Sequence, residues 1–480
     1  MEYVIKGRRP ESLFRFFEDI SAIPRGSYNE QGIADYLVAF ARERGLDVYR
    51  DQFHNVLIKK DATADRVGEA PVLLQGHTDM VCEKDANSAH DFTKDPLRLW
   101  VDGDMLRATG TTLGADNGVA VAIMLSLLDG EIPSHPPIEC LFTSAEEVGM
   151  DGARGFDYSR IAARRMVNLD SEALGMITCG CVGGERAEMR MPFRSVPFAG
   201  QAVRVVIGGL MGGHSGENIH CGRANANKLM GRLLSTLSHE MEDLCLISVA
   251  GGSKENAIPR ECEALISVGD FERADRILTE VGEAIAHELV EDDRGFSITV
   301  EDTESEPVMM SREDTLRAVA ILCCPANGVL AMSRDIEGLV EYSRNLGVVR
   351  TDAEELVVTF SSRSAMESRL DASAAELNAL ASLTNSTVIY YHRYPGWLFA
   401  KESPLRDAYS KAFLASTGRK AEIKLLHAGL ECGVIKASIP DMDIIAIGPA
   451  LFDLHSPQER LDLSSTELFW RTLEQLFTLL

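Results

Sequence analysis

The first 185 residues alternate between apolar strand-like runs and helical patterns. A long apolar run at 119–128 fits a buried helix. Strands that alternate with helices are typical of α/β domains with a largely parallel sheet. Four largely apolar runs fit short buried strands: 56–58, 72–74, 138–142 and 166–169. This part of the chain therefore predicts an α/β domain with a parallel or mixed sheet flanked by helices.

The pattern changes near residue 185. Strand-like runs at 202–207 and 356–360 and a helical pattern at 271–290 indicate an α+β unit. Because a buried-strand pattern returns at 444–447, this unit is inserted into the first domain rather than appended to it. The predicted organisation is one α/β domain in two parts, 1–185 and 399–480, interrupted by an inserted domain at 186–398.

Composition and charge narrow the classes of partner. The 480 residues include 48 Lys and Arg against 73 Asp and Glu, a net charge of −25. This acidity argues against binding to nucleic acid or anionic membranes. No signal peptide is visible, no apolar run is long enough for a membrane helix, and the ten cysteines lack C-x-x-C spacing. We expect a cytoplasmic protein with no nucleic-acid or membrane partner.

Five acidic or imidazole side chains follow predicted strands or open a predicted helix: His77, Asp116, Glu147, Asp170 and His455. Open α/β sheets bind ligands at the carboxyl ends of their strands, so these groups can converge. Each alone has an ordinary explanation. Asp116, in the glycine-rich stretch 109–119, could cap the following helix, and Glu146 with Glu147 could form a solvated turn.

Together, two imidazoles and three carboxylates suit two zinc-like or manganese-like ions that share one carboxylate. Such a pair polarises a carbonyl and lowers the pKa of a water molecule. Glu146 would accept the proton of that water and pass it to a leaving amine. Asp79 shares a face with His77 on an extended strand and would fix the tautomer of the imidazole.

Motifs spread over nearly the whole chain resemble the dinuclear-zinc aminoacylase and carboxypeptidase superfamily. The most similar branch is that of the aminoacyl-histidine dipeptidases, also called cytosol non-specific or carnosinase-like dipeptidases. The motifs occur in order: Q-G-H-T-D-M (75–80), T-T-L-G-A-D-N-G (111–118), E-E-V-G-M-D-G-A (146–153), N-L-D-S-E (168–172), G-G-H-S-G (212–216), N-A-I-P-R-E (256–261), H-A-G-L-E-C-G (427–433) and H-S-P (455–457).

The resemblance implies a zinc-exopeptidase-like fold with an inserted lid and two divalent ions, zinc first, with manganese or cobalt as alternatives. The implied substrate is a dipeptide, including Xaa-His and carnosine-like ones. A homodimer is the implied assembly, although one lid could also enclose the site alone. The implied roles are a bridging ligand (Asp116), ligands of one ion (His77, Asp170), ligands of the other (Glu147, His455), a general base and acid (Glu146) and a partner of His77 (Asp79).

The resemblance also assigns substrate contacts to the lid. His214 would polarise the scissile carbonyl, Asn256 would hold the substrate backbone, and Arg363 would hold its terminal carboxylate. Two alternatives stay open. The glycines around His214 equally suit a contact between two lids, and Arg363 equally fits a plain surface position.

Other functions fit part of this pattern. An N-acyl amino acid deacylase or a tripeptidase of the same superfamily would use the same metal centre. A non-catalytic metal-binding relative would keep the fold, but the intact His77, Asp79 and Glu146 argue against it. A dinuclear phosphoesterase could use similar ligands, but the chain lacks the phosphate-cradling G-x-x-x-x-G-K-[ST] motif.

Overall fold

The computed structural model describes residues 3–304, 307–334, 336 and 338–480. The chain forms two compact units. The first consists of Met1–Cys181, Trp397–Leu426 and Leu430–Leu480, and the second of Val182–Gly396 and His427–Gly429. The second unit thus interrupts the first, and three residues of the later part of the chain also belong to it.

An eight-stranded sheet forms the centre of the first unit, in the order β1-β2-β6-β3-β7-β23-β8-β22. Strand β3 is parallel to β6 and β7, β7 is parallel to β23, and β8 is parallel to β22, whereas the pairs β1–β2, β2–β6 and β8–β23 are antiparallel. The predicted parallel or mixed sheet is confirmed. The strands are β1 (Asp47–Arg50), β2 (Val56–Lys60), β3 (Val72–His77), β6 (Ile138–Thr143), β7 (Arg165–Asn168), β8 (Met176–Cys181), β22 (Glu422–Leu426) and β23 (Asp443–Ala446).

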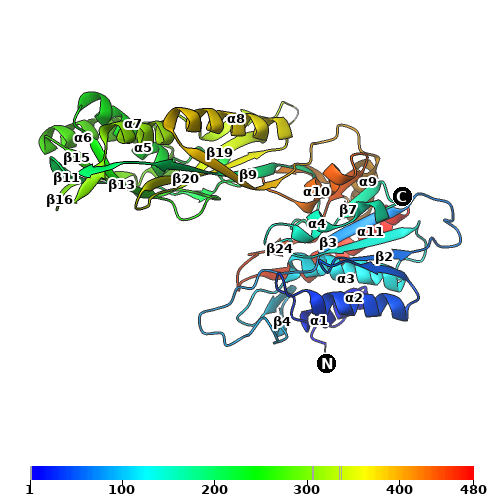
Figure 1. Ribbon diagram of the computed structural model, residues 1–480. Helices are drawn as coiled ribbons and strands as arrows, with labels where there is room; N and C mark the ends of the chain where they lie inside the picture. Colours follow the sequence, from blue (N-terminus) through cyan, green and yellow to red (C-terminus); the bar gives the residue numbers. More distant parts are fainter. Residues whose placement is uncertain (1–2, 305–306, 335, 337) are drawn as a thin grey trace. The chain divides into compact units, whose positions relative to one another are not determined.

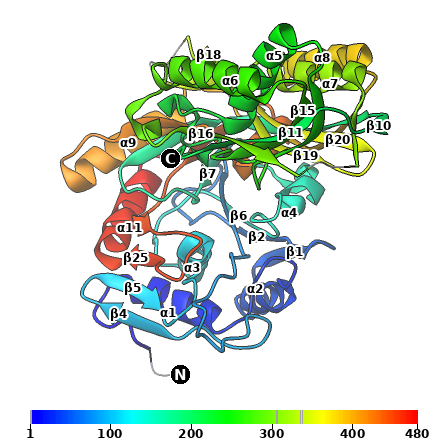
Figure 2. The ribbon, with the colours of Figure 1, turned by 90° about the vertical axis from the view of Figure 1, so that its left-hand side faces the viewer.

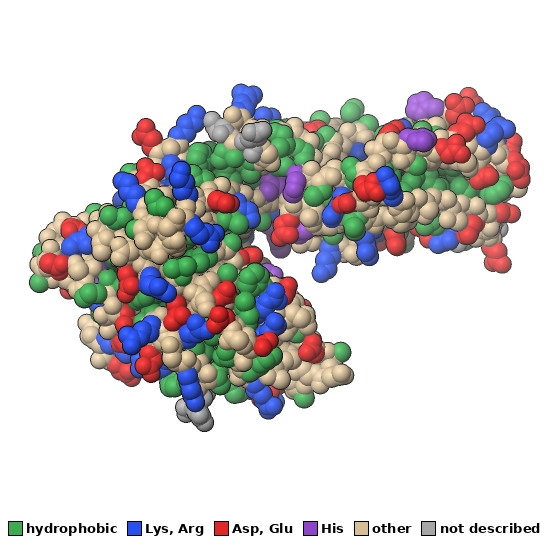
Figure 3. Space-filling model, turned by 180° about the vertical axis from the view of Figure 1, so that it is seen from behind, with side chains coloured by type: hydrophobic (Ala, Val, Ile, Leu, Met, Phe, Trp, Pro, Cys, Tyr) green, Lys and Arg blue, Asp and Glu red, His purple; other side chains and the backbone are tan. Residues whose placement is uncertain are grey.

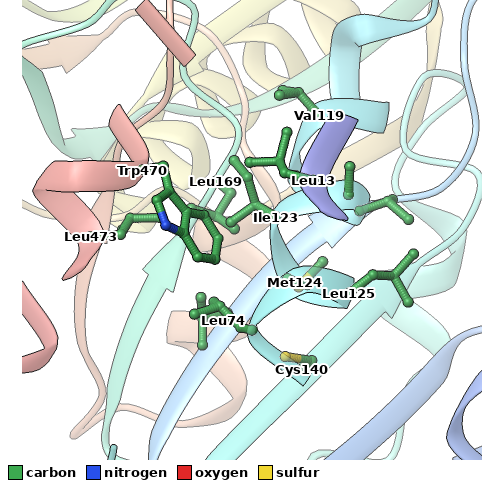
Figure 4. Packing of buried hydrophobic residues seen from close by; sticks show 14 of the residues in the cluster. Leu13, Leu74, Val119, Ile123, Met124, Leu125, Cys140, Leu169, Trp470 and Leu473 are labelled. Carbon is green, nitrogen blue, oxygen red and sulfur yellow. The ribbon is translucent and has the colours of Figure 1, made fainter. Parts of the chain in front are cut away.

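Helices cover both faces of this sheet. In β3, Val72 and Leu74 join the core on one face and Leu73 joins the core on the other, as expected for alternating side chains. The first core lies under α1 (Glu11–Ser21), α2 (Gln31–Glu43), α3 (Ala115–Asp129), α9 (Pro404–Thr417) and α11 (Leu463–Phe477). The second includes α10 (Glu431–Ser438), which packs against α4 (Asp151–Gly155). Figure 4 shows Leu74 of β3, Ile123 of α3 and Trp470 of α11 in the first core.

A small four-stranded sheet, in the order β24-β25-β5-β4, joins distant segments of the first unit. Its strands are β4 (Leu99–Asp102), β5 (Met105–Ala108), β24 (Leu451–Phe452) and β25 (Arg460–Asp462). The β5–β25 pairing aligns Met105 with Asp462 and Arg107 with Arg460. It therefore places the Asp116 loop (residues 109–116, which run from β5 into the first residues of α3) beside the loop between β24 and β25, which carries His455.

The second unit is built on a nine-stranded sheet, in the order β16-β11-β15-β13-β19-β20-β9-β21, with β18 also paired to β19. Alternate residues of β11, such as Val203 and Val205, enter one core with the helices, and the helices lie on one face of the sheet (Figures 1 and 2). The strands are β9 (Gly183–Pro192), β11 (Gln201–Gly208), β13 (Cys245–Gly251), β15 (Cys262–Val268), β16 (Ser297–Thr303), β18 (Gly328–Met332), β19 (Val340–Thr351), β20 (Glu355–Ser364) and β21 (Thr387–Tyr394), and the helices are α5 (Ala226–Glu240), α6 (Phe271–Ala286), α7 (Arg312–Cys323) and α8 (Glu367–Thr384).

Two short ribbons complete this unit. Strand β12 (Gly213–His214) pairs with β14 (Ala257–Ile258), and β10 (Ser195–Pro197) pairs with β17 (Val308–Met310). The first ribbon aligns His214 with Ala257, the neighbour of Asn256. Single 3₁₀ turns occur at Tyr158–Arg160 of the first unit and at Ile219–Cys221 and Glu291–Asp293 of the second.

Acidic and basic side chains are interspersed over the face shown in Figure 3. Among the described residues, no helix is both long enough and apolar enough to cross a membrane.

Candidate metal centre

Three of the predicted donors and Glu146 lie at or just after the carboxyl ends of three neighbouring parallel strands. Strand β3 ends at His77, Glu146 and Glu147 follow β6 by three and four residues, and Asp170 follows β7 by two. Because the register pairs His77 with Thr143 and Gln75 with Asn168, the carboxyl ends of the three strands lie level with one another. The convergence of these four side chains follows from the parallel pairing of the three strands.

Asp116 does not act as a helix cap. The residue before α3 is Gly114, which has left-handed dihedral angles and no side chain that could cap the helix. Asp116 itself has a non-helical backbone (φ −78°, ψ 107°), as does Asn117. The capping alternative for Asp116 is therefore excluded, and its carboxylate is available for other partners.

The Asp116 carboxylate lies between two imidazoles. Its Oδ1 atom is 3.1 Å from His77 Nε2 and its Oδ2 atom is 3.2 Å from His455 Nε2. On the first side, Asp170 Oδ1 lies 3.8 Å from His77 Nε2, and on the second side Glu147 Oε2 lies 3.2 Å from His455 Nε2. Each side of Asp116 thus faces one imidazole and one further carboxylate.

These side chains form two donor sets with Asp116 in common. The donor atoms of His77, Asp116 and Asp170 lie within 4.8 Å of one another, and so do those of Asp116, Glu147 and His455. A buried oxygen, Glu147 Oε1, has no hydrogen-bond partner within the described part of the chain. Because a buried acceptor without a partner is costly and carboxylates and imidazoles suit zinc or manganese, the site fits two divalent cations.

The electrostatics of the cluster favour positive charge. Burial opposes protonation of His77, but its hydrogen bonds to Asp116 and Asp79 outweigh burial and raise its pKa well above the usual value. Hydrogen bonds to Asp116 and Glu147 raise the pKa of His455 to about 11. The carboxylates therefore attract protons to these imidazoles, and cations would compete with those protons.

Asp79 contacts the imidazole of His77 in the first donor set and the backbone of the two adjacent glutamates. His77 Nδ1 lies 3.1 Å from the backbone oxygen of Asp79 and 3.4 Å from its Oδ1 atom. The fully buried Asp79 carboxylate also accepts the backbone N–H groups of Glu146 and Glu147 and the hydroxyl of Ser27. With Nδ1 held as the donor, loss of the Nε2 proton leaves a lone pair on Nε2 that can bind a metal.

The two adjacent glutamates have different environments. Glu147 faces His455, whereas burial raises the pKa of Glu146 to about 8, with nearby Glu431 and Glu147 adding to the effect and His77 opposing it. A carboxyl group that titrates near neutral pH is suited to accept and return a proton. This difference agrees with separate roles for the pair.

Comparison with known proteins gives the family. The model of peptidase family M20/M25/M40 matches residues 73–478. The chain belongs to this family. This M20-family peptidase is 36% identical over 472 residues to the cytosol non-specific dipeptidase of Escherichia coli (strain K12), covering 97% of each chain. The resemblance inferred from the motifs is confirmed.

Solved structures show the same relationship. The aminoacylhistidine dipeptidase from Vibrio alginolyticus is 35% identical, with a TM-score of 0.92 over 98% of this chain and 97% of that one. The aminopeptidase PepT from Bacillus cereus ATCC 10987 shares the fold at 15% identity, with a TM-score of 0.57 over 98% of this chain and 99% of that one. This M20-family peptidase therefore shares its fold with both solved structures.

A buried polar network that reaches Asp170 of the candidate metal centre was not predicted. Gln75 and Thr143 donate hydrogen bonds to Glu431 Oε2, and Asn168 donates to Gln75 Oε1 at 2.6 Å. The oxygen of the Asn168 side chain accepts the backbone N–H of Asp170 at 3.2 Å. The available signal was the presence of Gln75 and Asn168 inside apolar strands, where a polar side chain needs a partner.

The second unit of the peptidase holds the three residues predicted to contact substrate. His214 is half-buried, and its Nδ1 atom accepts the N–H groups of Gly216 and Glu217, so its Nε2 carries the proton. Burial and the charge of Arg363 lower the pKa of His214. The result is a neutral imidazole with an N–H donor at Nε2.

Arg363 is buried in strand β20 rather than placed on a plain surface. Only 5% of the residue is exposed, and its Nη1 donates to the Tyr394 hydroxyl at 3.1 Å, while its Nε has no partner among the described residues. Asn256, by contrast, shows a backbone contact, in which its oxygen accepts the N–H of Ser215. The surface alternative for Arg363 is thus excluded.

His427 is a further half-buried imidazole in this unit that was not predicted. Its Nδ1 donates to the Val340 oxygen at 3.0 Å, and its Nε2 accepts from the Ser343 hydroxyl at 2.7 Å. Burial and the charge of Arg363 lower its pKa to about 4, so it is neutral at physiological pH. Its position in the H-A-G-L-E-C-G motif was the available signal.

Proposed function

We propose that this M20-family peptidase is a dinuclear metal-dependent dipeptidase. The observation that carries the proposal is the Asp116 carboxylate, whose two oxygens each face one imidazole and one donor set. His77 and Asp170 would hold one ion, and Glu147 and His455 the other. We propose zinc for both positions, with manganese or cobalt as the other ions that such ligands accept.

When bound, the two ions supply Lewis acidity, which polarises the peptide carbonyl and makes water more acidic. Glu146 accepts one proton from the attacking water as the new C–O bond forms. It then donates that proton to the nitrogen of the leaving amino acid as the C–N bond breaks. The second proton of the water leaves the new carboxyl group for the amine, so the products are one carboxylate and one ammonium group, and Glu146 returns to its starting state.

The inserted unit, proposed as a lid, would supply the groups that recognise the substrate. His214 would donate its Nε2–H to the scissile carbonyl, Arg363 would bind the terminal carboxylate, and Asn256 would hold the substrate backbone. A neutral donor at His214 and a buried cation at Arg363 support these roles.

The proposed substrates are dipeptides, including Xaa-His and β-alanyl-histidine, and the proposed location is the cytoplasm. The names of the E. coli and Vibrio relatives, a cytosol dipeptidase and an aminoacylhistidine dipeptidase, support both points. A homodimer is the proposed assembly.

The deciding experiment compares substrate classes on the zinc-loaded protein. Alanyl-histidine and β-alanyl-histidine are assayed beside a tripeptide and N-acetylated amino acids, with Glu146→Gln as the matched inactive control. We expect hydrolysis of the free dipeptides only. Faster cleavage of the N-acetyl compounds would instead assign a deacylase, and faster cleavage of the tripeptide would assign a tripeptidase.

A further inference from the structure

Glu459 is a buried carboxylate that binds the backbone of the loop carrying Asp116. It is 2% exposed and accepts four consecutive N–H groups. Oε2 accepts from Leu113 at 2.7 Å and Gly114 at 2.9 Å, and Oε1 accepts from Ala115 at 2.8 Å and Asp116 at 3.2 Å. Both oxygens of the carboxylate are therefore committed to this loop.

These four N–H groups need an external acceptor. The first N–H groups of a helix have no partner within the helix, and Gly114, the residue before α3, has no side chain that could accept them. A carboxylate at this end of a helix is also favoured by the helix dipole. Glu459 meets both needs and holds the backbone of Asp116 in its non-helical conformation.

The same residue connects the two sides of the metal centre. Glu459 follows His455 by four residues in the segment between β24 and β25. The opposite side of the loop is held by Arg25, which is buried and donates to the backbone oxygens of Gly114 and Thr78. The Asp116 loop is thus held by a carboxylate on its N–H groups and a guanidinium on a carbonyl.

We propose that Glu459 is a positioning residue that fixes the bridging carboxylate of Asp116 relative to His455, so that both donor sets stay intact. The inference rests on the proposed dinuclear centre. The described hydrogen bonds of Glu459 come from backbone N–H groups and not from donor atoms, so its effect on metal binding would pass through the backbone of the 113–116 loop. Supporting residues of this kind typically contribute about 10- to 100-fold to metal affinity.

The test is zinc binding by Glu459→Gln, measured by competition with a chelating dye. An amide offers one acceptor oxygen and turns an NH₂ group toward two N–H donors, so the loop loses half of its anchors. We expect about 10- to 100-fold weaker zinc binding and faster hydrogen exchange at the amides of residues 113–116. At saturating zinc, kcat should recover largely, with KM unchanged.

Glu18→Gln is the matched control. Glu18 is also a buried carboxylate of the first unit that accepts two backbone N–H groups, those of Val4 and Ile5, but it holds the N-terminal segment. This variant should bind zinc as the wild type does. Glu459→Asp keeps the charge with a shorter reach and should bind zinc with intermediate affinity, and it replaces the glutamine variant if that one does not fold.

The outcomes separate the two proposals. Wild-type protein that binds no zinc refutes the metal centre, and this inference falls with it. If the wild type binds two ions and the Glu459 variants bind them equally tightly, the metal centre stands and the role of Glu459 is refuted. An equal loss of zinc affinity in Glu18→Gln also refutes it, because the effect would then be general.

Discussion

Asp116 Oδ2 lies 3.2 Å from His455 Nε2, and the other oxygen of the same carboxylate faces a second imidazole. Removal of this carboxylate should therefore disrupt both donor sets at once. We expect Asp116→Ala to lose both ions, whereas His455→Ala should lose chiefly one. Metal content per chain after gel filtration measures this, with the exposed Asp102→Ala as the control. Two tightly bound ions in Asp116→Ala would exclude a bridging role.

The neighbouring glutamates should separate binding from catalysis. Glu146→Gln keeps the shape of the side chain but removes the proton acceptor, so turnover should fall by about 10²- to 10⁴-fold with the metal content unchanged. Glu147→Gln should lose metal instead, because Glu147 belongs to the donor set with His455. Kinetics and metal analysis on the same preparations check both. Near-normal turnover in metal-loaded Glu146→Gln would contradict the mechanism.

Metal binding should release protons. In the metal-free protein the pKa of His455 is about 11 and that of His77 is well above its usual value, so both imidazoles are protonated near neutral pH. A metal binds only the neutral imidazole, so affinity should rise as pH rises from 6 to 9. Calorimetry in two buffers with different ionisation enthalpies measures the protons released. A heat that is independent of the buffer would contradict this.

The stability of the metal-free protein should depend on Glu431. Burial raises the pKa of Glu431 from 4.5 to about 7, so the folded state holds this proton more tightly than the unfolded state. Its contribution is present below pH 4.5 and is lost as pH rises through 7. Relative to Glu431→Gln, the wild type should lose up to about 3 kcal/mol of unfolding free energy over this range, since one pKa unit corresponds to about 1.4 kcal/mol.

Urea unfolding at pH 5 and pH 8 in the presence of a chelator measures this difference. The glutamine variant can still accept the hydrogen bonds of Gln75 and Thr143 through its one oxygen, so it isolates the ionisation of the carboxyl group. Parallel pH dependence of the two proteins would show that Glu431 titrates at its ordinary value.

Substrate recognition by Arg363 predicts a selective loss. Arg363→Met should lower kcat/KM for a free dipeptide by about 10- to 100-fold, because a charge-assisted hydrogen bond contributes about 1.5–3 kcal/mol. The same variant should change little with the dipeptide amide, which lacks the terminal carboxylate. Arg350→Met, on the adjacent strand β19 and more exposed, is the control. Equal losses on both substrates would assign Arg363 a structural role.

The sequence by itself determined the local features of this protein. The apolar runs predicted the strands that became β2, β3, β6, β7 and β23, because buried strands require continuous apolar side chains. The order of motifs predicted the family, and parallel strand ends explain why His77, Glu147 and Asp170 could be expected to meet. All of these depend on residues close together in the chain or on a repeating rule.

The tertiary structure decided what depends on contacts between distant segments. In the sequence alone, Asp116 also fits a helix cap. The pairing of β5 with β25 in the folded chain shows that its loop lies beside that of His455. Likewise, Glu459 lies in none of the motifs, and the H-A-G-L-E-C-G motif that contains Glu431 does not show which groups surround it. Their roles follow from which backbone and side-chain donors surround them after folding, because a hydrogen-bond partner is chosen by position in space, which the local sequence does not encode.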